Sequence, residues 1–144
     1  MKIKKMLRAW RIPIACSLCL LFVFKVVLMI GYVPSNSMEP TISKGSLIFG
    51  VRLYGELQCG DVIIFEKEGK NVVKRIAAVP GDIIYLDDNT QTVSVNQPLP
   101  EATRILHVPA RSYFVLGDNP PASVDSRFWN EPFISREDIL AKLL

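Results

Sequence analysis

An apolar segment of 22 residues, Ile12–Val33, constrains this chain more than any other feature of its sequence. At 1.5 Å per residue, a helix of this length crosses about 30 Å of hydrocarbon. Five basic residues and no acidic ones precede the segment, whereas Gly31–Met38, at its end, contains no basic residue. The positive-inside rule therefore predicts a cytoplasmic basic tail over residues 1–11, a membrane anchor over residues 12–33 and a domain outside the membrane over residues 34–144.

A cleaved secretory signal is the alternative interpretation of this amino-terminal pattern. Such a signal needs a cleavage site of small residues after its apolar core, and Lys25–Val33 consists mostly of Val, Leu, Met and Ile. We therefore predict a retained anchor. Lys25 lies near the middle of the span, where its side chain is expected to extend toward the membrane surface at a cost of about 2.5 to 3.5 kcal/mol.

The charged residues are unevenly distributed along the chain. Residues 1–30 carry six basic and no acidic residues, whereas residues 31–144 carry eleven basic and fourteen acidic ones, so the net charge of +3 comes from the tail. A nucleic-acid-binding domain loses its main support from this distribution. One His and three Cys offer no zinc finger and no disulfide framework, so we expect no metal and no cofactor. Cys59 receives no predicted role.

Short β-rich runs separated by turn residues follow Pro40. The predicted strands are Ser46–Tyr54, Asp61–Glu66, Asn71–Val79, Asp82–Leu86, Thr92–Val95, Arg104–Val108 and Tyr113–Leu116. Seven short strands at this spacing predict an all-β domain that is antiparallel and built as a barrel or a sandwich. Ser135–Leu144 is predicted to be a short carboxy-terminal helix, because Ser135 can cap it and Asp138 follows three residues later.

The first candidate for chemistry is Ser37, in the segment Pro34–Thr41 directly after the apolar segment. Two prolines stiffen this segment. A serine hydroxyl is a weak nucleophile until a base removes its proton, so Ser37 indicates a catalytic site only together with such a base. Taken alone, the segment is equally well explained as a polar linker that leaves the membrane.

The second candidate is Lys74, in the predicted strand Asn71–Val79. Side chains alternate along a strand, so Lys74 shares a face with the apolar residues Val72, Ile76 and Ala78. Burial lowers the pKa of a lysine amine and makes it available as a general base near neutral pH. The alternative is that this face is the solvent side of an edge strand, where lysine is common.

The third candidate is the Gly-, Asn- and Pro-rich segment Gly117–Arg127. Asp125 and Arg127 can pair and fix this segment, and Ser123 can form local hydrogen bonds. An ordinary turn after a buried strand is the alternative. A Ser-His-Asp hydrolase would need His107, the one histidine, as its base, and no motif surrounds it.

Taken together and in this order, the segments resemble the type I signal peptidases, which are membrane-anchored serine proteases with a Ser-Lys dyad. The family pattern Pro-Ser-x-Ser-Met-x-Pro-Thr is met by Pro34–Thr41, and the Gly-Asp-hydrophobic-Phe strand by Gly60–Phe65. The Lys-Arg…Pro-Gly-Asp motif is met by Lys74–Asp82, and the Gly-Asp-Asn…Ser-x-Asp-Ser-Arg motif by Gly117–Arg127. Lysine at the base position is similar to the bacterial and organellar branch of the family.

The resemblance implies a catalytic role for each matched residue. Ser37 falls on the nucleophile and Lys74 on the general base. Ser35, through its hydroxyl, and Ser37, through its backbone N–H, would stabilise the oxyanion. By the same resemblance, Ser123 orients the lysine amine, Asp125 and Arg127 hold that loop in place, and His107 has no part in the reaction.

The implied activity is cleavage of amino-terminal signal peptides from translocated preproteins, after small residues, at the outer surface of the bacterial cell membrane. Pockets for small side chains would be lined by Val33, Met38, Ile42 and Val73, and an extended substrate would add as a strand to the sheet edge. The implied partners are preprotein signal peptides and the lipid bilayer, with the secretion translocon as a further candidate. Nucleic acid and metal are not among them.

The chain departs from the family pattern in two places. Pro120–Pro121 stand where the family usually has Arg, which stiffens the loop and removes a charge. The segment between the Lys motif and Gly117 is short, so we expect a minimal catalytic core. Three alternatives share part of the pattern: a conjugation- or pilus-related maturation peptidase with the same dyad, an intracellular self-cleaving repressor-type protease, and a non-catalytic anchored β-module. The anchor argues against the repressor type.

Overall fold

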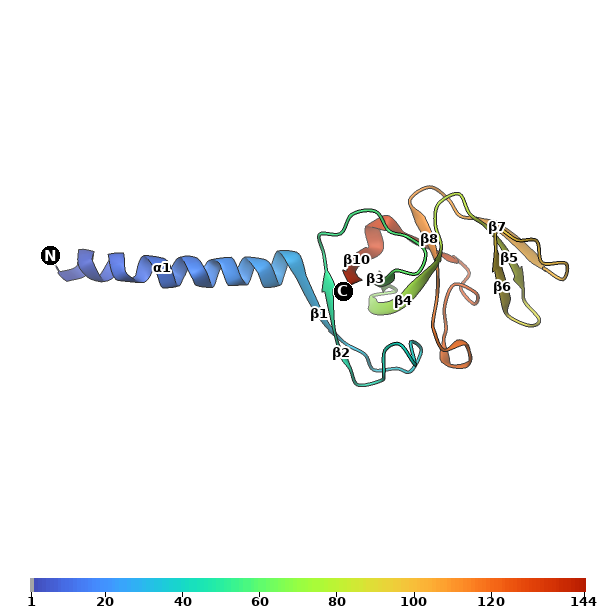
Figure 1. Cartoon of the computed structure of the whole chain (residues 1–144), viewed down its shortest axis with the longest axis horizontal. Coiled ribbons are helices and arrows are strands. Elements are labelled where there is room, and N and C mark those ends of the chain that lie inside the picture. The colour runs from blue at the N-terminus through green and yellow to red at the C-terminus, as the bar shows by residue number, and fades with distance from the viewer. Residues whose placement is uncertain (1) are drawn as a thin grey trace.

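The computed structural model describes residues 2–144, with side chains described from Trp10 onward. Helix α1 (Lys2–Phe22) continues into a π-helical turn (Val23–Val27), and together they project from the β-domain (Figure 1). The stretch Trp10–Val27 is long and apolar enough to cross a membrane, and it is not buried against the rest of the described chain. At 1.5 Å per residue, its 18 residues extend about 27 Å.

The helical part ends before the predicted anchor boundary at Val33. Leu28–Tyr32 forms strand β1, which pairs antiparallel with β2 (Leu47–Val51) along its whole length. A continuous apolar run does not distinguish a helix from a buried strand by periodicity, and here pairing with β2 satisfies the backbone groups. The apolar segment is therefore divided between the helix and the first strand of the domain.

Ten strands within residues 2–144 form two antiparallel sheets (Figure 1). The larger sheet has the order β1-β2-β10-β3-β4-β8-β9, and the smaller one the order β6-β5-β7. The remaining strands are β3 (Val62–Lys67), β4 (Lys70–Ala78), β5 (Ile83–Asp87), β6 (Thr92–Val95), β7 (Arg104–His107), β8 (Ser112–Leu116), β9 (Phe133–Ser135) and β10 (Ile139–Leu143). The predicted all-β antiparallel class is confirmed, and neither sheet closes into a barrel over the described residues.

The predicted carboxy-terminal helix is wrong. Ser135 does cap a turn, because its hydroxyl accepts a hydrogen bond from the Glu137 N–H, but this 3-10 turn ends at Asp138. The chain then forms β10, which lies between β2 and β3 in the larger sheet. Ile139 and Ala141 are both buried, and a register shift between them places their side chains in two different core clusters.

The hairpin β3–β4 sets the register of the strand that carries Lys74. Glu68 and Gly69 connect the two strands with positive φ values of 53° and 73°, as a two-residue hairpin turn requires. Pairing then runs from Lys67 opposite Lys70 to Lys74 opposite Ile63. A shift of one residue would move the Lys74 side chain to the other face of the sheet.

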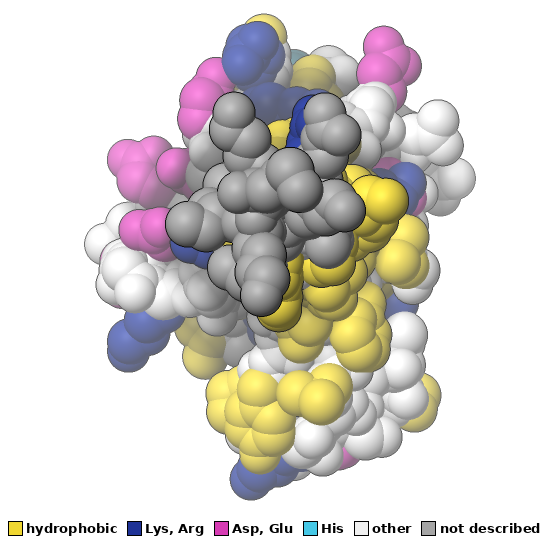
Figure 2. All heavy atoms as spheres, turned by 90° about the vertical axis from the view of Figure 1, so that its left-hand side faces the viewer, with side chains coloured by type: hydrophobic (Ala, Val, Ile, Leu, Met, Phe, Trp, Pro, Cys, Tyr) yellow, Lys and Arg dark blue, Asp and Glu magenta, His cyan; other side chains and the backbone are white. Residues whose placement is uncertain are grey.

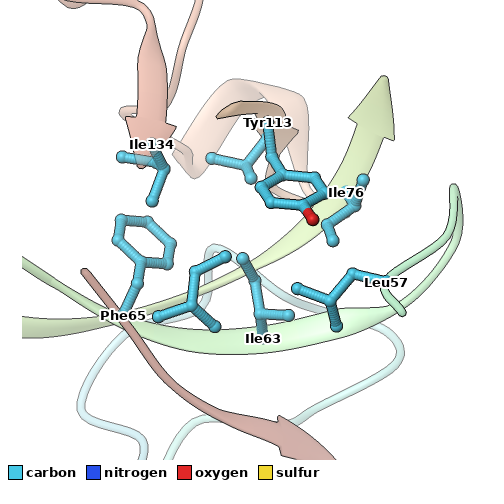
Figure 3. Close-up of a cluster of buried hydrophobic side chains, with 8 residues drawn as sticks. Leu57, Ile63, Phe65, Ile76, Tyr113 and Ile134 are labelled. Atoms are coloured by element: carbon cyan, nitrogen blue, oxygen red, sulfur yellow. The ribbon is translucent and has the colours of Figure 1, made fainter. Parts of the chain in front are cut away.

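The core lies on both faces of β3. Ile63 and Phe65 enter one cluster, shown in Figure 3, and Ile64 enters a second cluster on the opposite side of the strand. The first cluster consists of Leu57, Ile63, Phe65, Ile76, Tyr113, Val115, Ile134 and Ile139. The second consists of Val33, Met38, Ile42, Ile48, Ile64 and Ala141, so it holds the segment that carries Ser37.

The part of the domain from which the helix projects exposes hydrophobic side chains. On the β1–β2 hairpin, Ile30 lies opposite Phe49 and Tyr32 lies opposite Leu47, and all four side chains are exposed. Figure 2 looks onto this side of the molecule and shows hydrophobic side chains exposed on it. Because β1 begins directly after the helical part of the chain, the exposed apolar pairs of β1–β2 lie at the end of the domain from which the helix projects.

Candidate active site

Ser37 lies in a tight turn that is anchored by its neighbour. Met38 is almost fully buried in the cluster beneath the turn, and the Ile42 N–H donates to the Met38 carbonyl over 2.8 Å. The Ser37 side chain is itself buried, and its Oγ lies 3.4 Å from the Ser35 Oγ. The structure thus brings the two predicted serines within contact of each other. Most of Pro34–Thr41 is exposed, but the burial of Ser37 and Met38 does not fit a simple polar linker.

Lys74 is 3% exposed, so it does not lie on the solvent side of an edge strand. Burial lowers the pKa of the Lys74 amine, and the positive charge of Arg127 lowers it further. The negative charges of Asp125 and Asp118 act in the opposite direction without cancelling the effect of burial. The net lowering favours the neutral amine, which is the form that a general base needs.

Ser37 and Lys74 line one cavity of about 150 Å³. The cavity is formed by two chain segments, residues 32–38 and 71–74. The motif that carries Ser37 and the motif that carries Lys74 therefore meet there. In the described chain the two side chains share this cavity without a direct hydrogen bond between Lys74 Nζ and Ser37 Oγ. Its remaining lining residues are Tyr32, Val33, Pro34, Ser35, Met38, Asn71, Val72 and Val73.

Ser123, Asp125 and Arg127 form one buried polar network. The Asp125 carboxylate accepts hydrogen bonds from the Ser123 hydroxyl at 2.7 Å, from the Gly117 N–H at 3.0 Å and from Arg127 Nε and Nη2 at 2.8 Å each. Asp125 is 0% exposed, and a buried carboxylate is tolerated only with such compensation. Burial opposes ionisation, but the bonds from Arg127, Gly117 and Ser123 leave the pKa of Asp125 below its ordinary value.

Gly117 and Asn119 hold the Ser37 turn from the other side, a role that sequence reasoning did not assign to them. The Asn119 N–H donates to the Ser37 carbonyl and its side-chain amide to the Asn36 carbonyl, both over 3.0 Å. Gly117 leaves no room for a side chain, since a β-carbon there would lie 2.6 Å from the Ser37 carbonyl oxygen. The Gly-Asp-Asn motif marked both positions in the sequence, but it did not indicate which segment they contact.

Arg75 joins three of the segments that the sequence motifs marked. Its Nε and Nη2 bind the two carboxylate oxygens of Asp118 at 2.8 and 2.6 Å. Its Nη1 donates to the Gly60 carbonyl at 2.7 Å, and Nη2 also reaches the Thr41 hydroxyl at 3.3 Å. One guanidinium therefore connects the segments of Ser37, Gly60 and Asp118, which are far apart in the sequence. The alternation argument, which concerned only the other face of this strand, missed this role.

The chain matches the family model described as signal peptidase, peptidase S26, over residues 6–103 and 89–144. The chain belongs to this family. Signal peptidase I of Bacillus licheniformis is 32% identical over 86% of this chain and 80% of its own length. Signal peptidase I T of Bacillus subtilis is 33% identical over 81% of this chain and 72% of its own length.

Longer members of the peptidase S26 family match over a smaller part of their length. Signal peptidase I of Pseudomonas aeruginosa is 26% identical over 73% of this chain, and the chain spans 56% of that relative. A crystal structure of a signal peptidase I from Enterococcus faecalis is 28% identical, with a TM-score of 0.46, over 62% of this chain and 97% of that one.

The other residues that the signal peptidase resemblance singled out have clear positions. Val33, Met38 and Val73 line the cavity, whereas Ile42 packs in the cluster beneath it. Pro120–Ala122 forms a 3-10 turn that leads directly into Ser123. His107 is exposed on β7 and is not among the residues that line the cavity.

Proposed function

We propose that this chain is a membrane-anchored signal peptidase that removes amino-terminal signal peptides from translocated preproteins, with Ser37 as nucleophile and Lys74 as general base. The observation that carries the proposal is the burial of Lys74, with its lowered pKa, in the wall of the cavity that Ser37 also lines. Membership of the peptidase S26 family and the relatives named signal peptidase I support the same activity.

In the proposed reaction, the neutral Lys74 amine accepts the Ser37 proton while Ser37 Oγ attacks the carbonyl carbon of the scissile peptide bond. The C–N bond then breaks, the lysine ammonium gives its proton to the leaving amine, and an acyl-enzyme remains. Water, deprotonated by the same amine, hydrolyses the ester and restores Ser37. Catalytic hydrogen bonds often shorten when substrate binds, so we expect the Ser37–Lys74 contact to form in the complex.

Ser35 is proposed to stabilise the oxyanion together with the Ser37 backbone N–H. The Ser35 hydroxyl lies 3.4 Å from the attacking oxygen and is held by Pro34 on a short segment after β1. A donor directed at the oxyanion typically contributes about 10² to 10³ in rate. The developing negative charge would therefore meet a hydroxyl next to the nucleophile.

Asp125 is the charge that most strongly favours a protonated, inactive Lys74. Its pairing with Arg127 compensates that charge, because the guanidinium binds both carboxylate oxygens and itself lowers the pKa of Lys74. We propose that the pair lets Asp125 hold Ser123 and Gly117 in place without keeping Lys74 charged. This assigns Ser123, Asp125 and Arg127 a positioning role.

An extended substrate has an open edge beside this cavity. On its side away from β3, strand β4 pairs with β8 only from Arg75 onward, so residues 70–74 are left unpaired there. A peptide added at this edge would run past the Lys74 amine. The cavity is small and lined by Val33, Met38 and Val73, which suits a small apolar side chain before the cleaved bond.

We propose that the basic tail lies in the cytoplasm and the catalytic domain outside the bacterial cell membrane. The basic residues before the helix support this orientation. The exposed pairs of β1–β2 support a position of the domain against the bilayer, because apolar side chains gain by leaving water. Ser37 follows β1 by five residues, so the nucleophile would work close to the membrane surface.

The alternatives from the sequence are not favoured. A conjugation- or pilus-related maturation peptidase would use the same dyad, but the relatives are named signal peptidase I. A non-catalytic β-module has no need for a buried lysine beside a serine. The secretion translocon stays a candidate partner, since the substrate would reach the enzyme during translocation.

Cleavage by the full chain in detergent or proteoliposomes tests the proposal. The substrate is a preprotein with a signal peptide that ends in small residues, and the variants are Ser37→Ala and Lys74→Ala. Both should lose cleavage while the domain keeps its far-UV circular dichroism. An acylating inhibitor should label Ser37 in the wild type, as detected by mass spectrometry.

Two matched controls isolate the dyad from general effects. Ser43→Ala removes an exposed serine and Lys44→Ala an exposed lysine, both in the segment that follows Ser37. Both should cleave like the wild type. Undiminished cleavage by Lys74→Ala would refute the dyad, and no cleavage by the wild type would refute the activity.

A further inference from the structure

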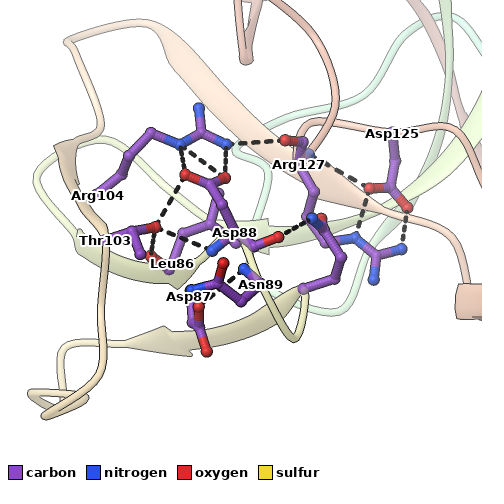
Figure 4. A network of polar contacts seen from close by, with 9 residues as sticks. Leu86, Asp87, Asp88, Asn89, Thr103, Arg104, Asp125 and Arg127 are labelled. Atoms are coloured by element: carbon purple, nitrogen blue, oxygen red, sulfur yellow. Dashed lines mark hydrogen bonds and ion pairs between the residues drawn. The ribbon is translucent and has the colours of Figure 1, made fainter.

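A contact between the smaller sheet and the loop that connects β8 to β9 reaches the polar network beside Lys74. Arg104 lies on β7 of the smaller sheet, and its Nη2 donates to the backbone carbonyl of Arg127 over 2.9 Å. Arg127 in turn binds the buried Asp125 through its side chain. Figure 4 shows the continuous network from Arg104 through Arg127 to Asp125. The smaller sheet thus holds the turn that carries Asp125.

The Arg104 guanidinium is itself held firmly. Asp88 accepts from Arg104 Nε at 3.0 and 2.9 Å and from Nη2 at 2.6 Å. Asp88 also accepts from the Thr103 hydroxyl at 2.9 Å, and its own N–H donates to that hydroxyl at 2.9 Å. These contacts fix the guanidinium in one orientation, so the second N–H of Nη2 is directed at the Arg127 carbonyl.

The exposure of the Arg104–Asp88 pair indicates that it orients neighbouring groups and adds little to the stability of the fold. The side chains of Arg104 and Asp88 are 35% and 41% exposed, and ion pairs at such positions contribute little to stability. The Arg127 carbonyl, by contrast, belongs to a residue that is 7% exposed and that grips a fully buried carboxylate. The half-exposed Arg104–Asp88 pair of the smaller sheet therefore orients the buried Arg127–Asp125 pair.

We propose that Arg104 is a positioning residue for the Ser37–Lys74 site: by holding the Arg127 carbonyl, it fixes the turn that carries Asp125 and Ser123. The inference rests on the proposed function of that site. It also gives the smaller sheet a role in the reaction, since Asp88 and Arg104 both belong to its β5–β7 side.

The charges around Lys74 make the consequence measurable. Asp125 and Asp118 raise the pKa of Lys74, Arg127 lowers it, and burial lowers it most. A looser Arg127 would compensate the negative charge of Asp125 less well. The pKa of Lys74 should therefore rise, and the acidic limb of the cleavage rate should move to higher pH.

The experiment compares Arg104→Gln with Arg111→Gln in the full chain. Arg111 forms an exposed ion pair with Glu137 and touches no residue of the site, so its variant removes an equivalent surface charge. For Arg104→Gln we expect kcat to fall by about tenfold, less than the about hundredfold that a 1 Å misplacement can cost, with KM nearly unchanged. Arg104→Lys, which keeps the charge and a donor, should recover part of the loss.

A second measurement follows Lys74 without substrate. NMR titration of the Lys74 side-chain amine should give a higher midpoint in Arg104→Gln than in the wild type, and an unchanged one in Arg111→Gln. Equal kcat, acidic limb and NMR midpoint in the two glutamine variants would overturn the inference. If only the wild-type cleavage fails, the proposed function falls, and the NMR midpoints still decide the role of Arg104. Should Arg104→Gln unfold, Asp88→Asn, which weakens the contacts that orient the Arg104 guanidinium, is compared with Arg111→Gln instead.

Discussion

Gly117 packs directly against Ser123: a β-carbon on Gly117 would lie 2.1 Å from the Ser123 Oγ and 2.5 Å from its Cβ. The same β-carbon would also meet the Ser37 carbonyl oxygen. Neither neighbour is the free end of a flexible side chain, since Ser123 is buried and bonded to Asp125. The glycine is therefore required by the close approach of two segments of the site.

Gly117→Ala is expected to lower kcat by about 10² or more, because it must displace Ser123 or the Ser37 turn by an amount that catalysis does not tolerate. Initial rates of preprotein cleavage measure the effect. Gly55→Ala is the matched control, since a β-carbon there meets nothing within 4 Å. If Gly117→Ala cleaves as well as Gly55→Ala, the packing of Gly117 has no part in catalysis.

Ser35→Ala is expected to lower kcat by about 10² to 10³ with little change in KM, since the oxyanion donor acts only in the transition state. Ser35→Thr keeps the hydroxyl and should restore much of the rate. Steady-state kinetics on a signal-peptide substrate separate the two constants. An increase in KM alone would instead assign Ser35 to substrate binding.

Lys74→Met should abolish cleavage and stabilise the fold at neutral pH. Burial lowers the pKa of Lys74 in the folded state, so the unfolded chain binds more protons between that pKa and the ordinary lysine value of 10.5. The free energy of unfolding of the wild type therefore rises with pH through this window. The extra stability of Lys74→Met over the wild type becomes smaller by the same amount. We expect a Tm increase of about 4 °C or more at pH 7, the shift that about 1 kcal/mol produces in a small domain.

Thermal unfolding of both proteins across pH checks this expectation. Lys70→Met, on the exposed end of the same strand, controls for the change in residue type. A difference between Lys74→Met and wild type that does not vary with pH would contradict a buried amine as its cause.

Arg75 and Asp118 are expected to show a coupling energy of about 1 kcal/mol in a double-mutant cycle with Arg75→Gln and Asp118→Asn. The side chains are 33% and 14% exposed, so solvent screening limits the value. Hydrogen bonds from Arg75 lower the pKa of Asp118. The coupling is thus present above the ordinary carboxyl pKa and is lost as pH falls through the lowered one. Urea unfolding of the four proteins measures it, and zero coupling at pH 7 would show that the pair is independent.

The strands and the catalytic candidates followed from the sequence where a local pattern determined them. All seven predicted strands are present, within a few residues of their predicted ends. Lys74 and Ile76 are both buried, as the alternation of side chains along a strand predicted. A register shift between Ile76 and Ala78 places Ala78 in a different core cluster from Ile76, so the prediction of one face shared by all three residues is wrong for Ala78.

The remaining features depend on contacts that no local pattern contains. Leu28–Tyr32 continues an apolar helix in the sequence and becomes a strand only because β2 pairs with it. Ile139–Leu143 follows a real cap at Ser135 and becomes a strand because a position between β2 and β3 is available. The bond from Arg104 to Arg127 joins residues 23 positions apart, one on β7 and one in the loop between β8 and β9, so neither segment indicates the other.

The helix, β1 and Ser37 follow one another directly along the chain, so β1 sets the distance between the end of the helix and the nucleophile. At about 3.3 Å per residue, its five residues extend about 16 Å, and the pairing with β2 prevents that length from changing. With Val27 at the lipid boundary and the domain against the bilayer, the distance of Ser37 from the membrane is limited by the length of β1. Peptide bonds farther from the membrane than this distance would escape cleavage whatever their side chains. The anchor would therefore select substrates by the distance of the scissile bond from the membrane, and the cavity would select them by side-chain size.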